Sequence, residues 1–324
     1  MKNEADNKAL GKRLRIACGH GNVRLTSAIS FSVCGPAVIM RMNSACLEAN
    51  MQDNEAAFEG WALALKRWLP EITRVEMGWS FAGDDSDPHY QRFLYRAGKF
   101  VALFGDWFVI SPANLAEFVR LKTAAADHKF LLNTELTSRT PPPAGECDCL
   151  GCAQLSEHKL ECHIVRNQEP LCGLLGIDRL ERQLPVGVFR DRVSSASDNV
   201  IFPRIASAID LWGVSRAEMR LFLFELKKRG RNKPLGIVSE LFFYACVMAD
   251  VQAGRFRFDT PNPAIEATTS VAAYILAPEW HPLIDGQMLG MVNAAFKRNG
   301  LRMGFGAVKI EPAETEKYRI VTQA

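Results

Sequence analysis

The first 138 residues alternate between short apolar runs and longer stretches in which apolar positions recur every three or four residues. The short runs have the length of strands, and the longer stretches have the periodicity of helices. Strands are predicted at 36–49, 74–79 and 106–110, and helices at 56–69, 89–104 and 112–126. This alternation predicts a small α/β domain.

A stretch rich in proline and cysteine, SRTPPPAGECDCLGC at 138–152, interrupts this pattern. Three consecutive prolines exclude a helix there, so we expect a boundary. The sequence predicts three parts, which are an α/β domain over 1–138, a linker over 139–172 and a second domain over 173–324.

The pattern changes to denser apolar runs in the second domain. LLGIDRLERQLPVGVF at 174–189 is interpreted as a helix that ends or kinks near Pro185. Strands are then predicted near 200–206, 207–214 and 220–228, a helix near 235–250, a strand at 268–276, a helix at 282–300 and a strand at 303–311. The predicted order is αβββαβ with an αβ extension, which places the whole chain in the α/β class.

Composition narrows the class of protein. With 48% hydrophobic and 23% charged residues, the 324-residue chain has the profile of a soluble globular protein of two domains. The first fifteen residues are too charged for a signal peptide, and charges interrupt every long apolar run, so we expect a cytoplasmic protein with no membrane partner. Nine cysteines without an export signal favour reduced thiols over disulfides. A net charge of +3 neither requires nor excludes nucleic acid.

Two of the apolar strands contain carboxylates. A hairpin with its loop near 216–218 would place Asp210 opposite Glu225, at a Cβ separation of about 5 Å. Like charges at that distance are destabilising where water is excluded, so a positive group is expected between them. Because side chains alternate along a strand, Lys227 shares the face of Glu225. Two carboxylates and an ammonium suit a hard divalent cation and the activation of a water molecule.

These three residues resemble the motif of the PD-(D/E)XK nuclease superfamily, which is an Asp followed on an adjoining strand by Glu-x-Lys. The resemblance covers roughly residues 173–310. It implies a restriction-endonuclease-like core with a central mixed sheet, and a Mg²⁺-dependent (or Mn²⁺-dependent) deoxyribonuclease. It also implies that Asp210 and Glu225 hold the metal, that Lys227 assists, and that the setting is anti-phage defence or DNA repair.

Further residues fit the same resemblance. Glu240-Leu-Phe-Phe-Tyr244 is similar to the Gln-x-x-x-Tyr motif of the RecB-like branch, with Glu in place of Gln. Residues four apart share one helical face, so both side chains could reach the site. Tyr244 can equally be a core tyrosine. The superfamily often has an acidic residue on the helix before the sheet, and Glu181 occupies that place, with Asp178 as the competing choice.

Other classes of function stay open at this point. The second domain could be an inactive nuclease fold that binds nucleic acid or a protein partner without cutting. It could also be a zinc-stabilised interaction module in which the carboxylates only form ion pairs. Exonuclease and endonuclease action are both compatible with the motif. The N-terminal domain could support a homo-oligomer or a protein partner.

The cysteines of the linker form a candidate metal site. Four soft ligands lie within sixteen residues, with the spacing C-x-C-x2-C-x9-C, and they are Cys147, Cys149, Cys152 and Cys162. Such a set suits tetrahedral Zn²⁺, which could stiffen a linker with little apolar material. An iron–sulfur cluster and free thiols are the alternatives.

Overall fold

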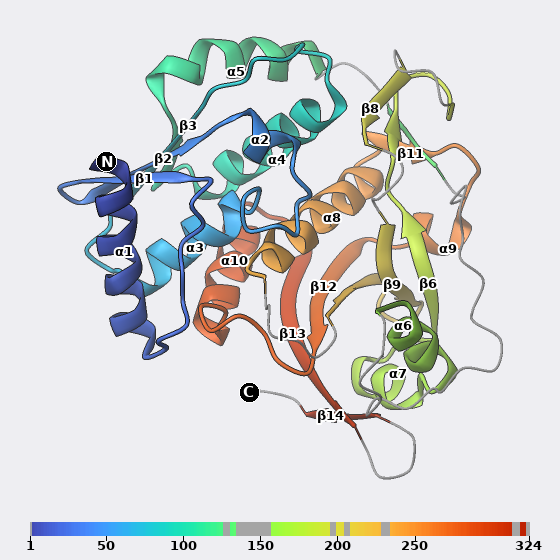
Figure 1. Cartoon of the computed structure of the whole chain (residues 1–324). Coiled ribbons are helices and arrows are strands. Elements are labelled where there is room, and N and C mark those ends of the chain that lie inside the picture. Colours follow the sequence, from blue (N-terminus) through green and yellow to red (C-terminus); the bar gives the residue numbers. More distant parts are fainter. Residues whose placement is uncertain are drawn as a thin grey trace. The chain divides into compact units, whose positions relative to one another are not determined.

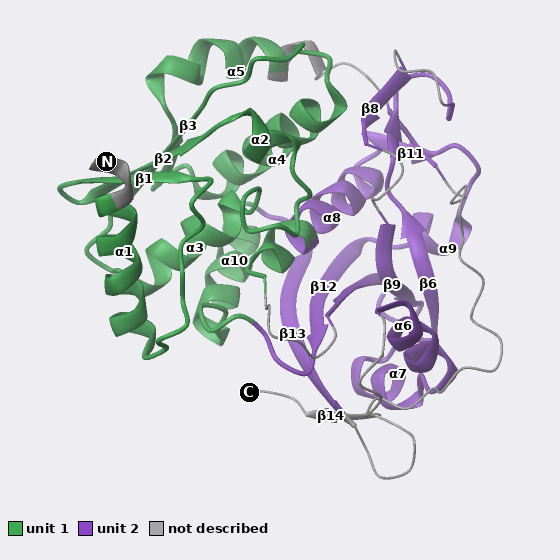
Figure 2. Ribbon diagram, viewed as in Figure 1, with its two compact units in different colours: residues 1–128, 234–240, 281–299 green, residues 129–233, 241–280, 300–324 purple. Residues whose placement is uncertain are grey.

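The structure, a computed structural model, describes residues 2–125, 130–133, 157–194, 199–203, 208–227, 234–312 and 318–321. The element order is shown in Figure 1. The chain divides into two compact units, coloured separately in Figure 2. Unit 1 comprises 1–128, 234–240 and 281–299, and unit 2 comprises 129–233, 241–280 and 300–324. Both units are therefore discontinuous in sequence, unlike the contiguous parts expected from the sequence.

Unit 1 contains a four-stranded sheet in the order β1-β2-β3-β4. Its strands are β1 (Ser30–Cys34), β2 (Ala37–Met42), β3 (Arg74–Trp79) and β4 (Phe108–Ile110). β1 and β2 form an antiparallel hairpin, and β2, β3 and β4 are parallel. Helices connect the parallel strands, which confirms the alternation of strands and helices predicted for this region.

Each helix of unit 1 contributes buried apolar side chains to its core. The helices are α1 (Lys2–Cys18), α2 (Ser44–Glu48), α3 (Phe58–Trp68), α4 (Pro88–Phe104), α5 (Pro112–Ala125), the first turn of α8 (Gly236–Gln252) and α10 (Gly286–Arg298). Asp87 caps α4 by accepting from the backbone N–H groups of His89 and Tyr90, and Pro88 opens the helix. The sequence did not predict α1 or β1, and the strand predicted at 36–49 ends at Met42, because Asn43 caps α2.

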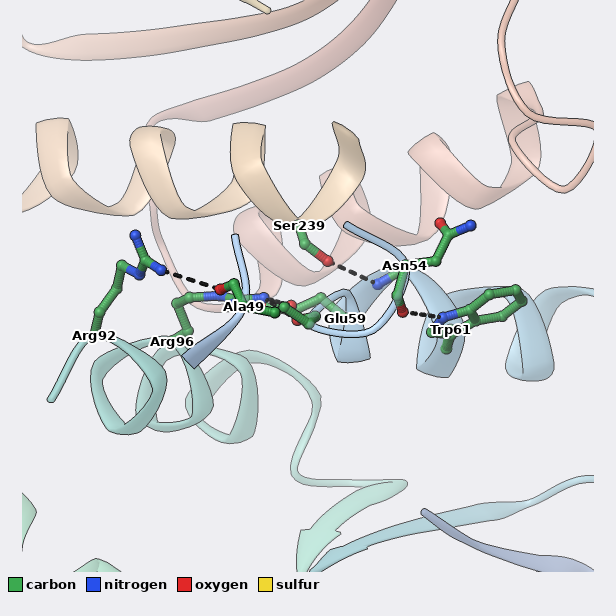
Figure 3. A network of polar contacts seen from close by, with 9 residues as sticks. Ala49, Asn54, Glu59, Trp61, Arg92, Arg96 and Ser239 are labelled. Atoms are coloured by element: carbon green, nitrogen blue, oxygen red, sulfur yellow. Dashed lines mark hydrogen bonds and ion pairs between the residues drawn. The ribbon is translucent and has the colours of Figure 1, made fainter. Parts of the chain in front are cut away.

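A buried ion pair lies among the apolar side chains of unit 1, between Glu59 of α3 and Arg96 of α4. The Glu59 side chain is fully buried, and that of Arg96 is 3% exposed. The guanidinium donates to both carboxylate oxygens and, at 2.8 Å, to the carbonyl of Ala56 (Figure 3). The hydroxyl of Ser239, from α8, accepts from the backbone N–H of Gly60 nearby. This last bond ties the segment 234–240 to α3.

Unit 2 is built on a six-stranded mixed sheet in the order β14-β13-β12-β10-β9-β6. The strands are β6 (Arg179–Pro185), β9 (Ala208–Ser215), β10 (Arg220–Leu226), β12 (Ser270–Ala277), β13 (Met303–Pro312) and β14 (Tyr318–Val321). β6, β9 and β10 form an antiparallel meander, and β12 and β13 continue parallel to β10. β14 closes the edge as an antiparallel strand.

The remaining elements of unit 2 are a small sheet and short helices. β11 (Phe256–Phe258), β5 (Phe130–Leu132), β7 (Val188–Phe189) and β8 (Val200–Phe202) form a second sheet in that order. The helices are α6 (Glu157–Arg166), α7 (Glu169–Leu175), α9 (Pro263–Glu266) and the rest of α8. Leu160, Ile164 and Leu171 pack with the sheet residues Leu211, Phe222, Phe224 and Leu226 in one apolar core.

Two predictions for unit 2 are wrong. The helix predicted over 174–189 is instead the end of α7 followed by β6, because Gly176, with φ 67, caps α7 in the left-handed conformation. Leu180 and Leu184 have helical spacing, but they are the buried positions of a strand. The strand predicted near 200–206 is β8, which belongs to the small sheet and not to the meander. The first strand of the meander is therefore β6.

Candidate active site

The β9–β10 hairpin brings the two strand carboxylates together. Its last paired residues are Leu211 and Phe224, so the next positions outward, Asp210 and Glu225, stand opposite each other. The turn spans 216–219. This is the register that the apolar pattern predicts, and directly opposite residues share one face of the sheet. Asp210 and Glu225 therefore share the face opposite to the core cluster that contains Phe224.

Direct contacts fix the geometry of this pair. Asp210 Oδ2 accepts from the backbone N–H of Leu226 at 2.7 Å. Lys227 Nζ donates to Glu225 Oε1 at 3.0 Å, as expected for residues two apart on one strand. The backbone N–H of Lys227 also donates to Leu276 of β12, at 3.1 Å. The structure thus places Asp210, Glu225 and Lys227 in one cluster at the end of β10.

The cluster is largely shielded from water. Glu225 is 3% exposed, the Lys227 side chain is 12% exposed, and Asp210 is half-buried. Charges interact more strongly at such a site than at the surface because the local dielectric constant is lower. A substrate anion or a cation that reached these groups would experience correspondingly strong electrostatic forces.

The structure adds a carboxylate that sequence reasoning missed. Glu157, the first residue of α6, places Oε2 at 3.9 Å from Lys227 Nζ. Glu157 lies on α6, one of two helices that precede the meander, and the resemblance implies an acidic residue on a helix before the sheet. The misassigned helix at 174–189 directed that expectation to the wrong segment. A correctly placed helix over 157–166 would have offered Glu157 and Glu161 as candidates.

The prediction that Glu181, or alternatively Asp178, is an acidic residue on the helix before the sheet is therefore wrong. Glu181 lies on strand β6, with its side chain 43% exposed and paired with Arg179 at 3.0 Å. Asp178 precedes β6 and accepts from the backbone N–H of Arg216 at the hairpin turn. Neither residue lies on a helix, so neither has the position at which the superfamily often has an acidic residue.

A second polar network surrounds Glu161, one turn after Glu157 on α6. Glu161 is buried and accepts from Arg182 Nε and Nη2 at 3.2 and 2.9 Å, and from Gln183 Nε2 at 3.2 Å. His158 Nδ1 lies 2.7 Å from the same guanidinium. Burial raises the pKa of Glu161, although the charge and hydrogen bonds of Arg182 oppose that rise.

The backbone of β6 is strained beside the cluster. Gln183 has φ 51, in the left-handed region, which costs a residue with a side chain about 1–3 kcal/mol. The β6–β9 ladder pairs Arg182 with Leu211 and Leu184 with Ile209, so Gln183 lies on β6 opposite Asp210 of β9. Such strain persists where the surrounding structure holds it, and functional sites are a common place for it.

The two residues of the predicted helix motif lie one turn apart on α8, as expected, but both are buried. Glu240 is 5% exposed and belongs to unit 1, whereas Tyr244 is fully buried and belongs to unit 2. α8 is apolar on nearly all sides, which is typical of a core helix. Burial of its whole side chain favours the interpretation of Tyr244 as a core tyrosine.

Only some of the residues predicted to bind a metal belong to the described part of the chain. Cys147, Cys149 and Cys152 lie outside the described residues, and Cys162 is buried in α6. Across the described part of the chain, no group of three or more His, Cys, Asp or Glu side chains is arranged to hold a metal ion. Asp210 and Glu225 are a pair of carboxylates on facing strands. That number suits Mg²⁺, which usually takes one or two carboxylates and keeps several waters.

Comparison of the chain with protein-family models, with curated proteins and with solved structures gave no match. Among the described residues, no helix combines the length and apolar character that crossing a membrane requires.

Proposed function

We propose that the chain is a metal-dependent nuclease that hydrolyses phosphodiester bonds of DNA, with Asp210, Glu225 and Lys227 at its active site. The observation that supports this most directly is the β9–β10 register, which sets Asp210 opposite Glu225, together with the contact of Lys227 Nζ to Glu225. With the strands of the small sheet and the short helix α9 left aside, the order α6-α7-β6-β9-β10-α8-β12 adds support, because it has the succession αβββαβ around these residues.

The side chains have separate tasks in this proposal. Mg²⁺ held by Asp210 and Glu225 would supply Lewis-acid stabilisation of the scissile phosphate and a water of lowered pKa. The backbone N–H of Leu226 orients the Asp210 carboxylate. Glu225 and Glu157 hold the Lys227 ammonium, which can donate to a phosphate oxygen or orient the attacking water.

The test is cleavage of one plasmid, supplied closed-circular and linearised, with Mg²⁺ or with EDTA. We expect Mg²⁺-dependent cutting that Asp210→Ala and Glu225→Ala each reduce by about a thousandfold or more, because a metal contributes several kcal/mol to such a transition state. Glu181→Ala, which removes an exposed carboxylate from the neighbouring strand, is the matched control and should retain activity.

The two DNA forms separate the two kinds of nuclease. Cutting restricted to the linear form would identify an exonuclease, and nicking of the closed circle an endonuclease. Wild-type rates in either Ala variant would refute the assignment.

A second candidate is a nuclease fold that binds DNA without cutting it. The observation in its favour is that Asp210 and Glu225 each accept a hydrogen bond from the protein itself, from Leu226 and Lys227, as structural carboxylates do. Binding of duplex DNA that is equal with Mg²⁺ and with EDTA, without any cleavage, would favour this candidate over the enzyme.

A further inference from the structure

Unit 1 contains a cavity of about 740 Å³. Four of its lining residues come from α1, four from the segment 24–28, and the other two are Ser30 of β1 and Asn43. Figure 1 shows α1 beside β1, and the cavity lies at this junction. We call it the α1 cavity. Its volume is that of a site for a small organic ligand, which ranges over about 300–1,000 Å³.

The α1 cavity lies at the edge of the sheet where ligands of α/β domains usually bind. Asn43 immediately follows β2, and Ser30 pairs with Arg41 near the end of that strand. The cavity therefore opens at the carboxyl end of a strand that runs parallel to its neighbour β3. In open α/β sheets, ligands bind outside the carboxyl ends of the strands.

The lining of the α1 cavity is positively charged. It includes Lys8, Arg15 and Arg24 and contains no carboxylate. Arg15 is oriented by donating through Nη1 to the carbonyl of Val23, at 3.0 Å. Within the described residues, Arg24 makes no hydrogen bond or ion pair. Three cations with hydroxyl and amide groups nearby favour an anion, and guanidinium groups match phosphate geometry.

Gly11 keeps part of the α1 cavity open. It lies in the interior of α1, where glycine costs about 0.5–1 kcal/mol relative to alanine. A Cβ at this position would stand 3.6 Å from Arg15 Nη1 and 4.0 Å from Leu25 Cγ, which is ordinary contact. A larger side chain there would occupy the space beside the guanidinium.

We propose that the α1 cavity binds a nucleotide, with Lys8, Arg15 and Arg24 contacting its phosphates. A bare phosphate would leave most of 740 Å³ unfilled, whereas Leu25 and Ala28 supply apolar surface for a base or sugar. This site consists only of unit 1 residues, whereas Asp210, Glu225 and Lys227 belong to unit 2. The proposal is therefore independent of the proposed nuclease activity.

Calorimetric titration of the full chain with ATP, in EDTA and low salt, tests the site. We expect saturable one-to-one binding, with adenosine and inorganic phosphate each bound at least tenfold more weakly. Lys8→Glu and Arg24→Glu alter exposed residues and should each weaken ATP binding about tenfold or more, since a hydrogen bond to a charged group contributes about that factor. Lys12→Glu, an equal charge change on α1 outside the lining, is the control and should bind normally.

Gly11 provides a second pair of variants that does not depend on charge. Gly11→Leu should block ATP binding, whereas Gly11→Ala should retain it, with thermal melting confirming that both are folded. Undetectable ATP binding by the wild type, or equal binding by Gly11→Leu and Gly11→Ala, would overturn the proposal.

Two further arms identify the occupant. Asp210→Ala should bind ATP as the wild type does. Loss of ATP binding in this variant would indicate that the nucleotide binds at the strand carboxylates, and it would refute binding in the α1 cavity. A duplex oligonucleotide should not compete with ATP. Competition that Lys8→Glu weakens in parallel would show that the cavity contacts the DNA backbone instead.

Discussion

Each unit places carboxylates and a cation among apolar side chains, but the two clusters are built differently. In unit 1, Glu59 and Arg96 form a one-to-one pair in which the guanidinium fork contacts both carboxylate oxygens. In unit 2, the described contacts gather two carboxylates, Glu225 and Glu157, around the single ammonium of Lys227, and Asp210 stands opposite Glu225. The unit 1 cluster pairs one carboxylate with one cation, whereas the unit 2 cluster gathers three carboxylates near one cation.

Under the proposed function, one cluster serves the fold and the other serves chemistry. A bidentate guanidinium–carboxylate pair satisfies both groups with rigid geometry and leaves few hydrogen-bonding positions open to a ligand. A lysine is a point charge on a flexible stem, and facing carboxylates are oxygen ligands that a hard cation can use. We therefore expect mutations in the unit 1 pair to change stability, and mutations in the unit 2 cluster to change activity.

Glu59→Gln is the strongest test of the expectation that the unit 1 pair governs stability. It removes the charge opposite Arg96 in a fully buried setting, and breaking such a pair typically costs 3–5 kcal/mol, so we expect about that loss in the free energy of unfolding. Urea unfolding measures it. Glu71→Gln removes the carboxylate of an exposed pair with Arg13 and should cost no more than about 1 kcal/mol. Equal losses in the two variants would show that burial does not govern the effect.

Lys227→Met tests the other side of the comparison. We expect DNA cleavage to fall by about a hundredfold or more, because a positioned proton donor typically contributes that factor. Mg²⁺ should still raise the melting temperature of the variant, since the carboxylates remain. Lys309→Met is a matched control, because Lys309 Nζ contacts Glu311 with the same spacing and the same 3.0 Å distance on β13. A loss of activity in both variants would mean that any strand lysine of this kind supports cutting.

Local patterns in the sequence account for much of the fold and for the central part of the site. The β9–β10 register follows from alternation in two apolar runs and the length of the turn, and these are local properties. The same holds for α3, β3, α4 and the parallel strands β12 and β13. α1 was missed because few of its residues are apolar, although Leu10 and Leu14 are fully buried.

The parts that sequence reasoning missed depend on long-range contacts. β5 pairs with β11 across more than a hundred residues, and no local pattern indicates such a partner. Glu157 approaches Lys227 only because α6 packs on the sheet. The α1 cavity similarly requires α1, the segment after it and β2 together. Gly176 is a local signal for the end of α7. The prediction gave more weight to the helical spacing of the leucines beyond it.

Tyr90→Phe extends the comparison to an uncharged group in unit 1. The buried Tyr90 hydroxyl donates to Glu117 at 2.7 Å and accepts from Trp79 Nε1 at 2.9 Å, and burial together with Glu117 raises its pKa. Removing the hydroxyl leaves the indole N–H without this acceptor, so we expect a loss of about 1–3 kcal/mol. Urea unfolding checks the value, and cleavage by the variant should be normal. A cleavage defect without a stability loss would assign unit 1 a direct part in the reaction.

The smallest expected effect concerns Glu161, which lies between the two cases. It has a guanidinium partner, as Glu59 has, but burial still raises its pKa above the usual 4.5. The folded protein then holds this proton more tightly than the unfolded chain does, so the contribution of Glu161 to stability is complete below that usual value. It declines as the pH rises through the folded pKa. Glu161→Gln removes this titration, so the stability of the variant relative to the wild type should increase between about pH 4.5 and pH 7. Urea unfolding of both proteins across this range measures the difference. A relative stability that instead decreases with pH would show that Arg182 outweighs burial, as in a pair of the Glu59–Arg96 kind.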